Sequence, residues 1–445
     1  MAALLRLVRS INSTVEEDNM PPEFSNNGVE SQFLKQGGAL LYLLALLYIL
    51  LALYQLAQHF LLPAFDLLVA RTAATPSVAG ALILPAILAV PDIIMSIVSV
   101  FIAVGNESVS KYYGVHLYGL TALVALAILF VPKNDLKPVA FKPALRDVAA
   151  VILAFAVFLL FSADGEWLAW EMALLLVLFL LYLLAVRALR RWLGTVRVAG
   201  ESHELEAESG GKGGAYIEGG GGNEGEQTEE EKPSSCGQTW LAAPPRLGWE
   251  SGSSVGTKAI HLVCLPVLML LKVTVPPPAC LACTGRLYPL TLLLVFLWEA
   301  LLGWAATSLA SPLGRALGLP SLITGVVIMA PLNIDFVLCI LLGRRGDLAV
   351  VVHFLLGRAI LHTTLETGLP NLLFNIVFAS PVHVKSDGAL GGLVLLLIVI
   401  LHLLLMLGIS KGRLNKMWAI PFLLMFLFYF FVIVVVEYSI IVLPF

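Results

Sequence analysis

Long apolar runs alternate with short polar stretches over most of the chain. An α-helix that crosses the hydrocarbon layer of a membrane needs about 20 mostly apolar residues. Ten runs reach or approach that length, so we expect ten membrane-spanning helices. The predicted spans are 38–61, 77–104, 113–132, 147–163, 167–187, 287–310, 320–343, 348–378, 388–409 and 416–442.

The composition agrees with a membrane protein. Hydrophobic residues make up 59% of the 445 residues and charged residues only 13%, whereas soluble domains carry about 25% charged residues. A chain with so little charge could not cover its surface in water. The fold class is therefore predicted to be all-α and polytopic, with the lipid bilayer as its surroundings.

A polar segment separates the first five predicted spans from the last five. Residues 199–257 are rich in glycine and in acidic residues and poor in large apolar groups. Such a segment cannot offset the entropy of ordering, so we predict a flexible loop, and a regulatory role for it stays open. An eleventh apolar run, Ala259–Val275, follows this loop.

The positions of the basic residues orient the helices, because loops rich in Lys and Arg stay in the cytoplasm. Four basic clusters fall on one side if the chain starts outside and crosses ten times, which makes the large loop cytoplasmic. A full crossing by 259–275 would turn the last two clusters outward, so we expect this run to be re-entrant or interfacial. The basic clusters are 133–146, 187–197, 344–345 and 411–416.

Five spans, a cytoplasmic loop and five spans of opposite orientation form the pattern of an inverted repeat. The stretch 348–378 contains Arg358, His362 and Glu366, and we expect either a broken helix or a helix with a re-entrant piece there. The predicted parts are a non-cytosolic tail (1–37), a first membrane repeat (38–187), a disordered cytoplasmic loop (188–286) with its apolar segment near 259–275, and a second membrane repeat (287–445).

Two of the apolar runs, one in each half, are interrupted by a proline and an acid. Pro91 and Asp92 interrupt the first, and Pro331 and Asp335 interrupt the second. An ionised carboxylate in the hydrocarbon layer is costly, so such residues usually face a cavity on an ion path. Interrupted segments in corresponding positions of two halves indicate the binding site of a secondary transporter.

Short sequence words between residues 38 and 415 are typical of one family. They are GALLY at 38–42, FLLPA at 60–64, SVAGA at 77–81, WE at 170–171, GDLAV at 346–350, GLP at 368–370 and GRLN at 412–415. In this order and spacing they make the chain resemble the cation/calcium antiporter superfamily, most closely the potassium-dependent sodium/calcium exchangers. The resemblance implies two inverted five-helix repeats around a midplane ion site.

Each repeat of that family carries a signature close to A-A-G-[ST]-[ST]-x-P-[ED] in a kinked helix. The resemblance implies that Asp92 and Asp335 are the metal ligands. A hard cation takes about six to eight oxygen ligands, so the helix must unwind to free backbone carbonyls. Asn333 and Ser96 are candidate oxygen donors, or partners in ordinary interhelical hydrogen bonds. The helix-breaking residues at the site are Pro85, Pro91 and Pro331.

The signature is eroded in this chain. Ile87 stands at the glycine position, and Leu88 and Ala89 stand at the hydroxyl pair. The family word G-S-x-x-x-N reads GVHLYG at 114–119, and G-S-N-x-x-D reads GRAILH at 357–362. Ordinary high-affinity exchange is therefore expected to be impaired or altered.

Three basic residues in the ligand regions carry further hypotheses. His116 and His362 titrate near neutrality and would suit proton coupling, or they are packed histidines. Arg358 either enters the cavity and replaces a bound cation beside Asp92 or Asp335, which would lock the transporter in one state, or extends to the headgroups. We expect Glu171 and Glu299, each beside a tryptophan, to anchor helices at the membrane interface.

These observations predict a secondary active cation antiporter of the sodium/calcium-exchanger type. Its transported ions would be Ca²⁺ and Na⁺, with K⁺ or H⁺ as further candidates and no cofactor. The alternative is a degenerate, non-transporting relative with a regulatory or assembly role. Neither an enzyme nor a nucleic-acid partner is expected, since no nucleotide loop, zinc motif or nucleophile elbow is present. The plasma membrane is the expected location, an endomembrane is the alternative, and the sequence does not indicate the oligomeric state.

Overall fold

The computed structural model describes residues 37–103, 107–132, 138–204, 255–276, 288–319, 321–385 and 389–437. It confirms an all-α polytopic membrane protein. Eight helices in these ranges are long and apolar enough to span a membrane, and a bent pair of helices would make a ninth span. Nearly all of the predicted tail, 1–36, and most of the predicted loop, 205–254, lie outside the described residues.

The first half contains five helical segments, three of which include a π-helical turn. They are α3 (Ala39–Leu56) with η2 (Ala57–Leu61) and α4 (Leu62–Thr72); α5 (Pro76–Val78) with η3 (Ala79–Ile83) and α6 (Leu84–Ala103); α7 (Val109–Tyr118) with η4 (Gly119–Leu123) and α8 (Val124–Phe130); α9 (Phe141–Ser162); and α10 (Ala169–Glu204).

The second half repeats this order after a separate helix, α11 (Val255–Thr274). Its segments are α13 (Tyr288–Ala316); α14 (Ser321–Thr324) with η6 (Gly325–Met329), η7 (Ala330–Leu332) and α15 (Ile334–Arg344); α16 (Leu348–Leu361) with η8 (His362–Glu366) and α17 (Thr367–Phe378); α18 (Ala389–Ile409); and η9 (Lys416–Trp418) with α19 (Ala419–Glu437).

Every predicted span corresponds to a helical segment, with four differences in detail. The first span continues to Thr72, and the third has a shorter apolar stretch, Gly114–Phe130. The stretch Leu348–Phe378 is one continuous helical run, so the prediction of a re-entrant piece there is wrong. The predicted disordered loop does not begin at residue 188, because α10 continues as a helix to Glu204.

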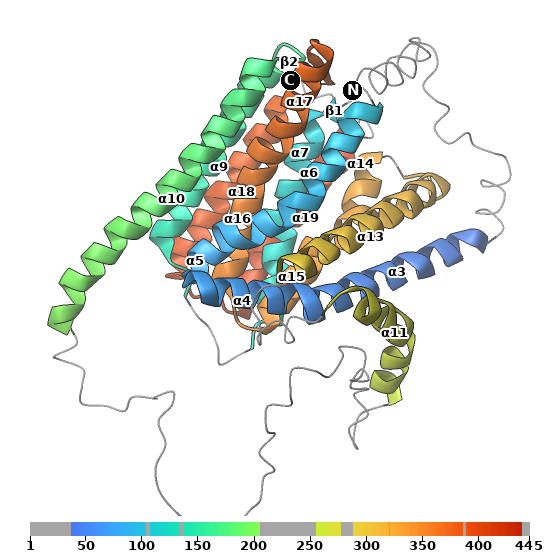
Figure 1. Ribbon diagram of the computed structural model, residues 1–445, viewed down its shortest axis with the longest axis horizontal. Helices are drawn as coiled ribbons and strands as arrows, with labels where there is room; N and C mark the ends of the chain where they lie inside the picture. The colour runs from blue at the N-terminus through green and yellow to red at the C-terminus, as the bar shows by residue number, and fades with distance from the viewer. Residues whose placement is uncertain are drawn as a thin grey trace, which may run out of the picture.

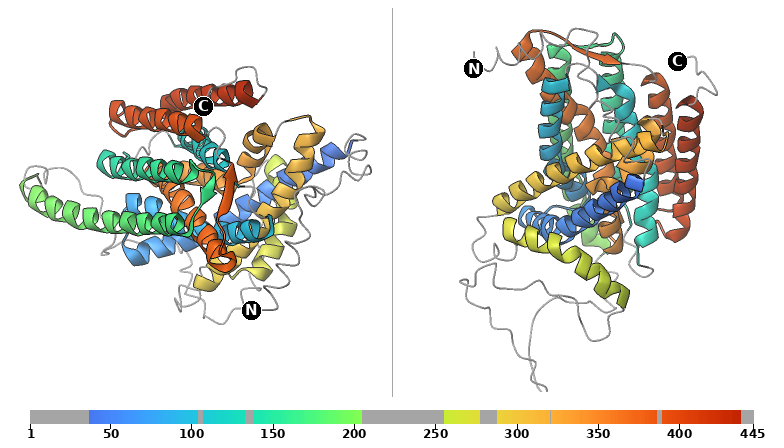
Figure 2. Two further views of the ribbon diagram at one scale, coloured as in Figure 1. Left: turned by 90° about the horizontal axis from the view of Figure 1, so that it is seen from above. Right: turned by 90° about the vertical axis from the view of Figure 1, so that its right-hand side faces the viewer.

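The two halves pack against each other through matching pairs of helices. α3 lies beside α13, and this pair crosses the other long helices obliquely (Figures 1 and 2). α16 packs on η3 and α6, and α8 makes the matching contact with α15. α9 contacts α16, and α7 makes the matching contact with α18. Likewise, α10 contacts α17, and α19 makes the matching contact with α8. Contacts between non-corresponding segments of the two halves are thus made in matching pairs, as two structural repeats would make them.

Glycine brings two of these crossings into backbone contact. Where α16 crosses η3, a Cβ atom on Gly357 would overlap the carbonyl oxygen of Ala81. Where α15 crosses α8, a Cβ atom on Gly343 would lie 2.6 Å from the carbonyl oxygen of Ala127. No side chain fits at either point, so the helix backbones are in direct contact at these two crossings.

Substituting Gly357 by alanine is expected to lower the free energy of unfolding by about 1–3 kcal/mol, because overpacking forces the two backbones apart. Gly303→Ala is the matched control, since Gly303 also lies inside a helix but has open space around its Cα. Denaturant titration of the detergent-solubilised variants measures both changes. Equal stability of the two variants would contradict the close crossing.

Four of the π-helical turns occupy corresponding places in the two halves, whereas η2 has no counterpart in α13. η3 and η6 interrupt the second and seventh segments, and η4 and η8 interrupt the third and eighth. Pro85 directly follows the start of α6, Pro331 lies in η7, and the helix axis bends by 61° between Gly325–Leu332 and Ile334–Arg344. Single π turns are frequent at functional sites, and these four mark the region where the two halves meet.

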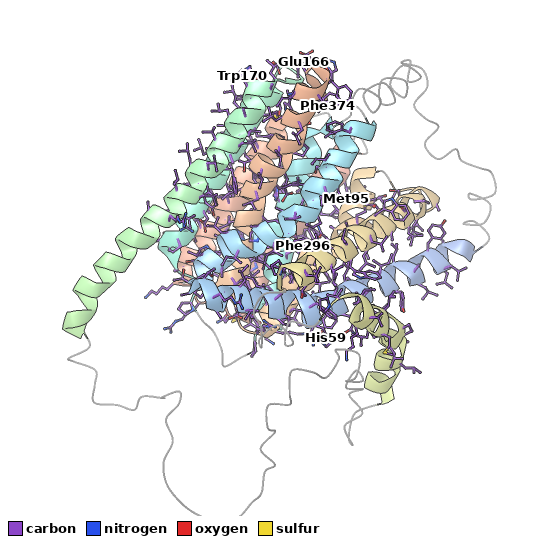
Figure 3. The ribbon with its side chains drawn as sticks, viewed as in Figure 1. His59, Met95, Glu166, Trp170, Phe296 and Phe374 are labelled. Carbon is purple, nitrogen blue, oxygen red and sulfur yellow. The ribbon has the colours of Figure 1, made fainter. Side chains whose placement is uncertain are left out.

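A small sheet closes one end of the bundle. Its strands are β1 (Glu107–Ser108), β2 (Glu166–Trp167) and β3 (Val382–Lys385), in the order β1-β3-β2. β1 pairs with β3 in parallel, with Glu107 opposite Val384, and β2 pairs antiparallel, with Glu166 opposite His383. Glu166 and Trp170 lie at the same end of the bundle as Phe374 (Figure 3).

The eleventh apolar run forms α11, which packs against α3 outside the main bundle (Figure 1). The apolar part, Leu262–Thr274, belongs to the shorter helices and would extend only about 20 Å, less than the hydrocarbon thickness. Its end is tied to α13, because the indole N–H of Trp298 donates to the Thr274 hydroxyl at 2.8 Å. A re-entrant or interfacial position for this helix stays a prediction.

Candidate functional site

Arg358 lies on α16, in the most buried of the candidate spans, and its guanidinium contacts three carboxylates. Its Nη1 donates to Glu366 Oε1 at 2.6 Å, and its Nε donates to Asp335 Oδ2 at 3.5 Å. Its Nη2 donates to Asp92 Oδ2. The side chain therefore enters the interior and joins acids from both halves, which decides between the two alternatives that the sequence left open.

The three acids differ in their access to the surface. The Asp92 side chain is 38% exposed, while those of Asp335 and Glu366 are 8% and 1% exposed. Asp92 is therefore the most accessible of the three acids. Asp335 Oδ1 and Glu366 Oε2 are buried and accept no hydrogen bond within the described part of the chain. These two oxygens are free to take a further partner.

A fourth acid, Glu299 on α13, belongs to the same site. It is buried and lies within electrostatic range of Arg358 and of the three acids around it. The prediction that Glu299 anchors α13 at the membrane interface is therefore wrong. We call Arg358 together with Asp92, Asp335, Glu366 and Glu299 the carboxylate centre. If every acid is ionised, one guanidinium faces four carboxylates, and three negative charges stay without a counter-charge.

The local sequence explains how Asp335 reaches the centre. The helix stops at Asn333, whose backbone is extended, and restarts at Ile334. The Asn333 side chain accepts a hydrogen bond from the backbone N–H of Asp335 at 3.4 Å, so Asn333 caps α15. Asp335 then sits in the first turn, where the partial positive charge of a helix N-terminus favours a carboxylate.

Two candidate oxygen donors are not brought to the guanidinium. Asn333 is exposed and serves as the helix cap. Ser96 is half-buried on α6, one turn after Asp92, and could reach only a ligand bound at that aspartate. Pro91 stands inside α6 directly before Asp92, and the helix continues past it, so the prediction that Pro91 breaks the helix is wrong. Ligand roles for Asn333 and Ser96 stay predictions.

The two candidate histidines, which the sequence did not predict to pair, lie side by side. His116 Nε2 and His362 Nδ1 lie 2.9 Å apart, so one ring nitrogen carries the proton and the other accepts it. The ring of His116 is buried and meets the ring of Phe155 edge-on. The pair joins α7 to η8, at the matching helix breaks of the third and eighth segments. It is a hydrogen-bonded bridge between the two halves.

No group of three or more His, Cys, Asp or Glu side chains within the described ranges is arranged to hold a metal ion. Around Arg358, the carboxylates converge on the guanidinium. Metal ligation by Asp92 and Asp335 therefore stays a prediction, and it requires the guanidinium to move aside or to share the site.

Comparison with known proteins identifies the scaffold. Residues 42–187 match the family described as sodium/calcium exchanger protein. The chain is 27% identical over 197 residues to sodium/potassium/calcium exchanger 2 of Mus musculus, a match that covers 43% of this chain and 28% of that protein. It is also 27% identical over 190 residues to exchanger 1 of Bos taurus, covering 42% and 16%. These matches confirm the resemblance of residues 42–187 to sodium/calcium exchanger proteins.

The matched stretch is less than a third of the length of these relatives. A solved structure of a sodium-calcium exchanger, NCX_Mj, aligns with a TM-score of 0.46 at 16% identity and covers 89% of this chain and 97% of that one. The matched family region contains Asp92 and His116. Asp335, Arg358 and Glu366 lie outside it.

A second buried polar site in this protein was not predicted. Asp147 on α9 is fully buried, and its Oδ2 lies 2.6 Å from His353 Nδ1 on α16. Its Oδ1 accepts from Arg146 Nε at 2.7 Å and from the Tyr182 hydroxyl at 3.1 Å. Asp147 thus joins α9, α10 and α16. In the sequence, Asp147 is an acid at the start of a predicted span. The sequence alone does not distinguish a buried acid there from one exposed to water at a helix end.

Glu171 behaves as expected for a residue at a helix end. Its Oε2 accepts from the backbone N–H of Leu168 at 2.8 Å, which satisfies a donor at the start of α10. Trp170 next to it is exposed, as a tryptophan at a membrane interface would be. The pair fixes the outer end of α10 beside the small sheet.

Proposed function

We propose that this protein is a secondary active cation antiporter that works by alternating access at the carboxylate centre, with Ca²⁺ and Na⁺ as the transported ions. The observation that carries the proposal is the convergence of Asp92, Asp335 and Glu366, from α6, α15 and η8, on the buried guanidinium of Arg358. Buried acids in membrane segments mark ion paths, and interrupted helices of two repeats form transporter sites.

Arg358 gives the proposed antiporter an altered selectivity. A guanidinium stays charged at every physiological pH, so it occupies the centre as a permanent monovalent cation. A transported ion must displace it or bind beside it, using the free oxygens of Asp335 and Glu366. An ion shifts the equilibrium between two conformations only through its different affinity for them. Return of Arg358 to the acids would eject the ion and complete the cycle.

The alternative is a non-transporting member of the superfamily. It is favoured by the same three ion pairs, because a guanidinium held by Asp92, Asp335 and Glu366 satisfies the acids without any ion from solution. In that case the fold is held in one state and serves a regulatory or assembly role. The antiporter proposal includes K⁺ or H⁺ as a candidate coupling ion. It also places the protein in the plasma membrane rather than in an endomembrane.

Uptake of ⁴⁵Ca²⁺ into sealed, sodium-loaded proteoliposomes tests the antiporter. Asp92→Asn and Asp335→Asn should each lower gradient-driven uptake at least tenfold, because each removes a carboxylate from the centre. Asp66→Asn is the control, since Asp66 forms an exposed pair with Arg345. The double variant Arg358→Ser/His362→Asp restores the family residues at both positions and should raise uptake.

The pattern of results separates the two candidates. Wild-type uptake that the centre variants abolish and Asp66→Asn spares supports the antiporter. An inactive wild type with an active Arg358→Ser/His362→Asp variant supports the non-transporting alternative. If neither protein moves Ca²⁺, Na⁺, K⁺ or H⁺ along a gradient, the antiporter proposal is wrong.

A further inference from the structure

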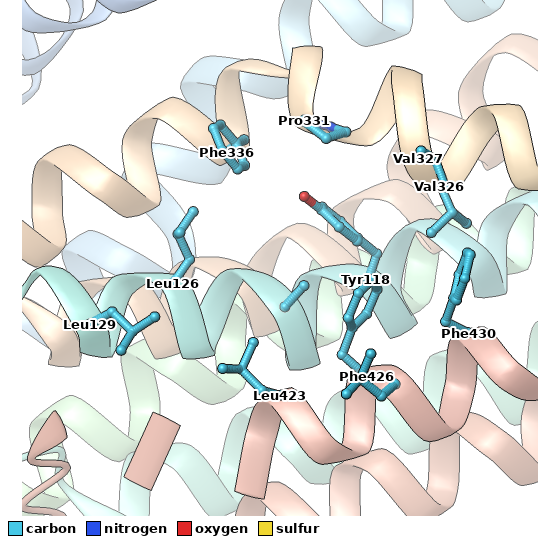
Figure 4. Close-up of a pocket in the computed structure, with 12 residues that line it drawn as sticks. Tyr118, Leu126, Leu129, Val326, Val327, Pro331, Phe336, Leu423, Phe426 and Phe430 are labelled. Atoms are coloured by element: carbon cyan, nitrogen blue, oxygen red, sulfur yellow. The ribbon is translucent and has the colours of Figure 1, made fainter. Parts of the chain in front are cut away.

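An apolar groove lies behind the carboxylate centre, on the surface formed by the third, seventh and tenth segments (Figure 4). Its volume is about 430 Å³, and its walls come from α8 and its neighbours, from the region η6 to α15, and from α19. Every lining side chain is apolar except that of Tyr118. The hydroxyl of Tyr118 points toward Pro331 and Phe336 (Figure 4).

The position of the groove determines what can fill it. Its walls belong to apolar helices that we expect to lie in the membrane, so we infer that the groove opens toward hydrocarbon and not toward water. An empty groove would forfeit dispersion contacts along its lining. The only abundant apolar molecule at that depth is a lipid acyl chain.

Two basic residues, Arg344 and Lys416, lie near one end of the groove. Leu129 and Leu423 lie at that end, and Val326 and Phe430 lie at the other (Figure 4). The guanidinium of Arg344 lies 5.2 Å from the ring centre of Phe130, the residue after Leu129. Lys416 is exposed and precedes Leu423 by seven residues, about 10 Å along the helix.

Further basic residues lie at the same end. The backbone N–H of Val139 donates to the carbonyl oxygen of Gly412 at 2.9 Å, which joins the segment before α9 to the turn before η9. α8 also packs on η9. The exposed basic residues of these segments are Lys142, Lys411 and Arg413. Basic pockets between membrane helices on the cytoplasmic side bind anionic lipid headgroups.

We propose that the groove binds one anionic phospholipid, with an acyl chain between α8, α15 and α19 and its headgroup at Arg344 and Lys416. The apolar walls accept the chain, and the basic end accepts the phosphate. This inference does not depend on transport. The chain would contact Pro331 and Phe336, which flank the bend that positions Asp335, so the lipid would stabilise one geometry of that bend.

Native mass spectrometry of the purified full chain tests the proposal, with phosphatidylserine and phosphatidylcholine as probes. One phosphatidylserine should bind per protein. Arg344→Gln/Lys416→Gln should weaken its binding about 30-fold, or about 1 kcal/mol for each charge removed. Arg187→Gln/Lys272→Gln is the control with the same change of charge on other helices, and should leave binding unchanged.

A second variant tests the groove itself. Ala122→Phe places a ring among the lining residues and should abolish retention of phosphatidylserine while leaving the protein folded by circular dichroism. If Ala122→Phe misfolds, the comparison of Arg344→Gln/Lys416→Gln with Arg187→Gln/Lys272→Gln still tests whether the groove binds the lipid. Equal binding of both lipids, or equal losses in the two charge variants, would overturn the proposal, as would full binding by a folded Ala122→Phe protein.

Discussion

Replacing Arg358 by leucine is expected to lower the free energy of unfolding by about 3–5 kcal/mol, since removing one partner of a buried ion pair leaves uncompensated charge in the interior. Asp335 and Glu366 are both buried, and both accept hydrogen bonds from this one guanidinium. Asp92 is more exposed, so water compensates part of its loss. Denaturant titration of the detergent-solubilised protein measures the change.

Arg345→Leu is the matched control for Arg358→Leu. Arg345 also pairs with an aspartate, Asp66 at 2.8 Å, but both side chains are exposed and such pairs contribute less than about 1 kcal/mol. Added Ca²⁺ should stabilise Arg358→Leu more than the wild type, because the guanidinium no longer competes for the acids and a ligand that binds only the folded protein raises its stability. A loss at Arg358 no larger than that at Arg345 would refute the neutralising role of the guanidinium.

Replacing Asp147 by alanine is the second large effect, with an expected loss of about 3 kcal/mol or more. The substitution removes the acceptor for Arg146, Tyr182 and His353 together, and each buried polar group left unpaired costs about 1–3 kcal/mol. The Nε2 atom of His353 is already buried without a partner among the described residues, so its ring would lose all hydrogen bonding seen there.

Tyr182→Phe removes a single bond to Asp147 and should cost only about 1 kcal/mol. A double-mutant cycle of Asp147→Ala with His353→Ala isolates the pair across α9 and α16. The second substitution should cost much less once the first is present, because its partner is already gone. Strict additivity of the two losses would show that the pair is not coupled.

The sequence predicts the helical segments well, because the bilayer imposes a length and an apolar composition on each span. Pro85 and Pro331 also lie at the helix breaks where they were expected, since proline removes a backbone donor. The π turn η4 contains no proline, and its place in Gly119–Leu123 has no comparable signal. Breaks made by packing alone are therefore missed.

The site was harder to predict, and Glu299 shows why. Its neighbour Trp298 faces α11 and donates to Thr274, which is an anchoring contact. Adjacent helix residues point in directions about 100° apart, so Glu299 faces the carboxylate centre. The sequence left two positions open for the Arg358 side chain, because a long side chain can reach either the interior or the headgroups. The packing of α16 decides between these two positions.

The small sheet limits how the helices can move. β1 follows α6, β3 follows α17 and β2 precedes α10, so main-chain hydrogen bonds tie three helix ends at the spacing of strands, about 4.8 Å. These ends cannot splay apart without breaking the sheet. A movement that separates α6, α10 and α17 at this end therefore costs those hydrogen bonds, so the sheet favours movements in which the three helices stay together.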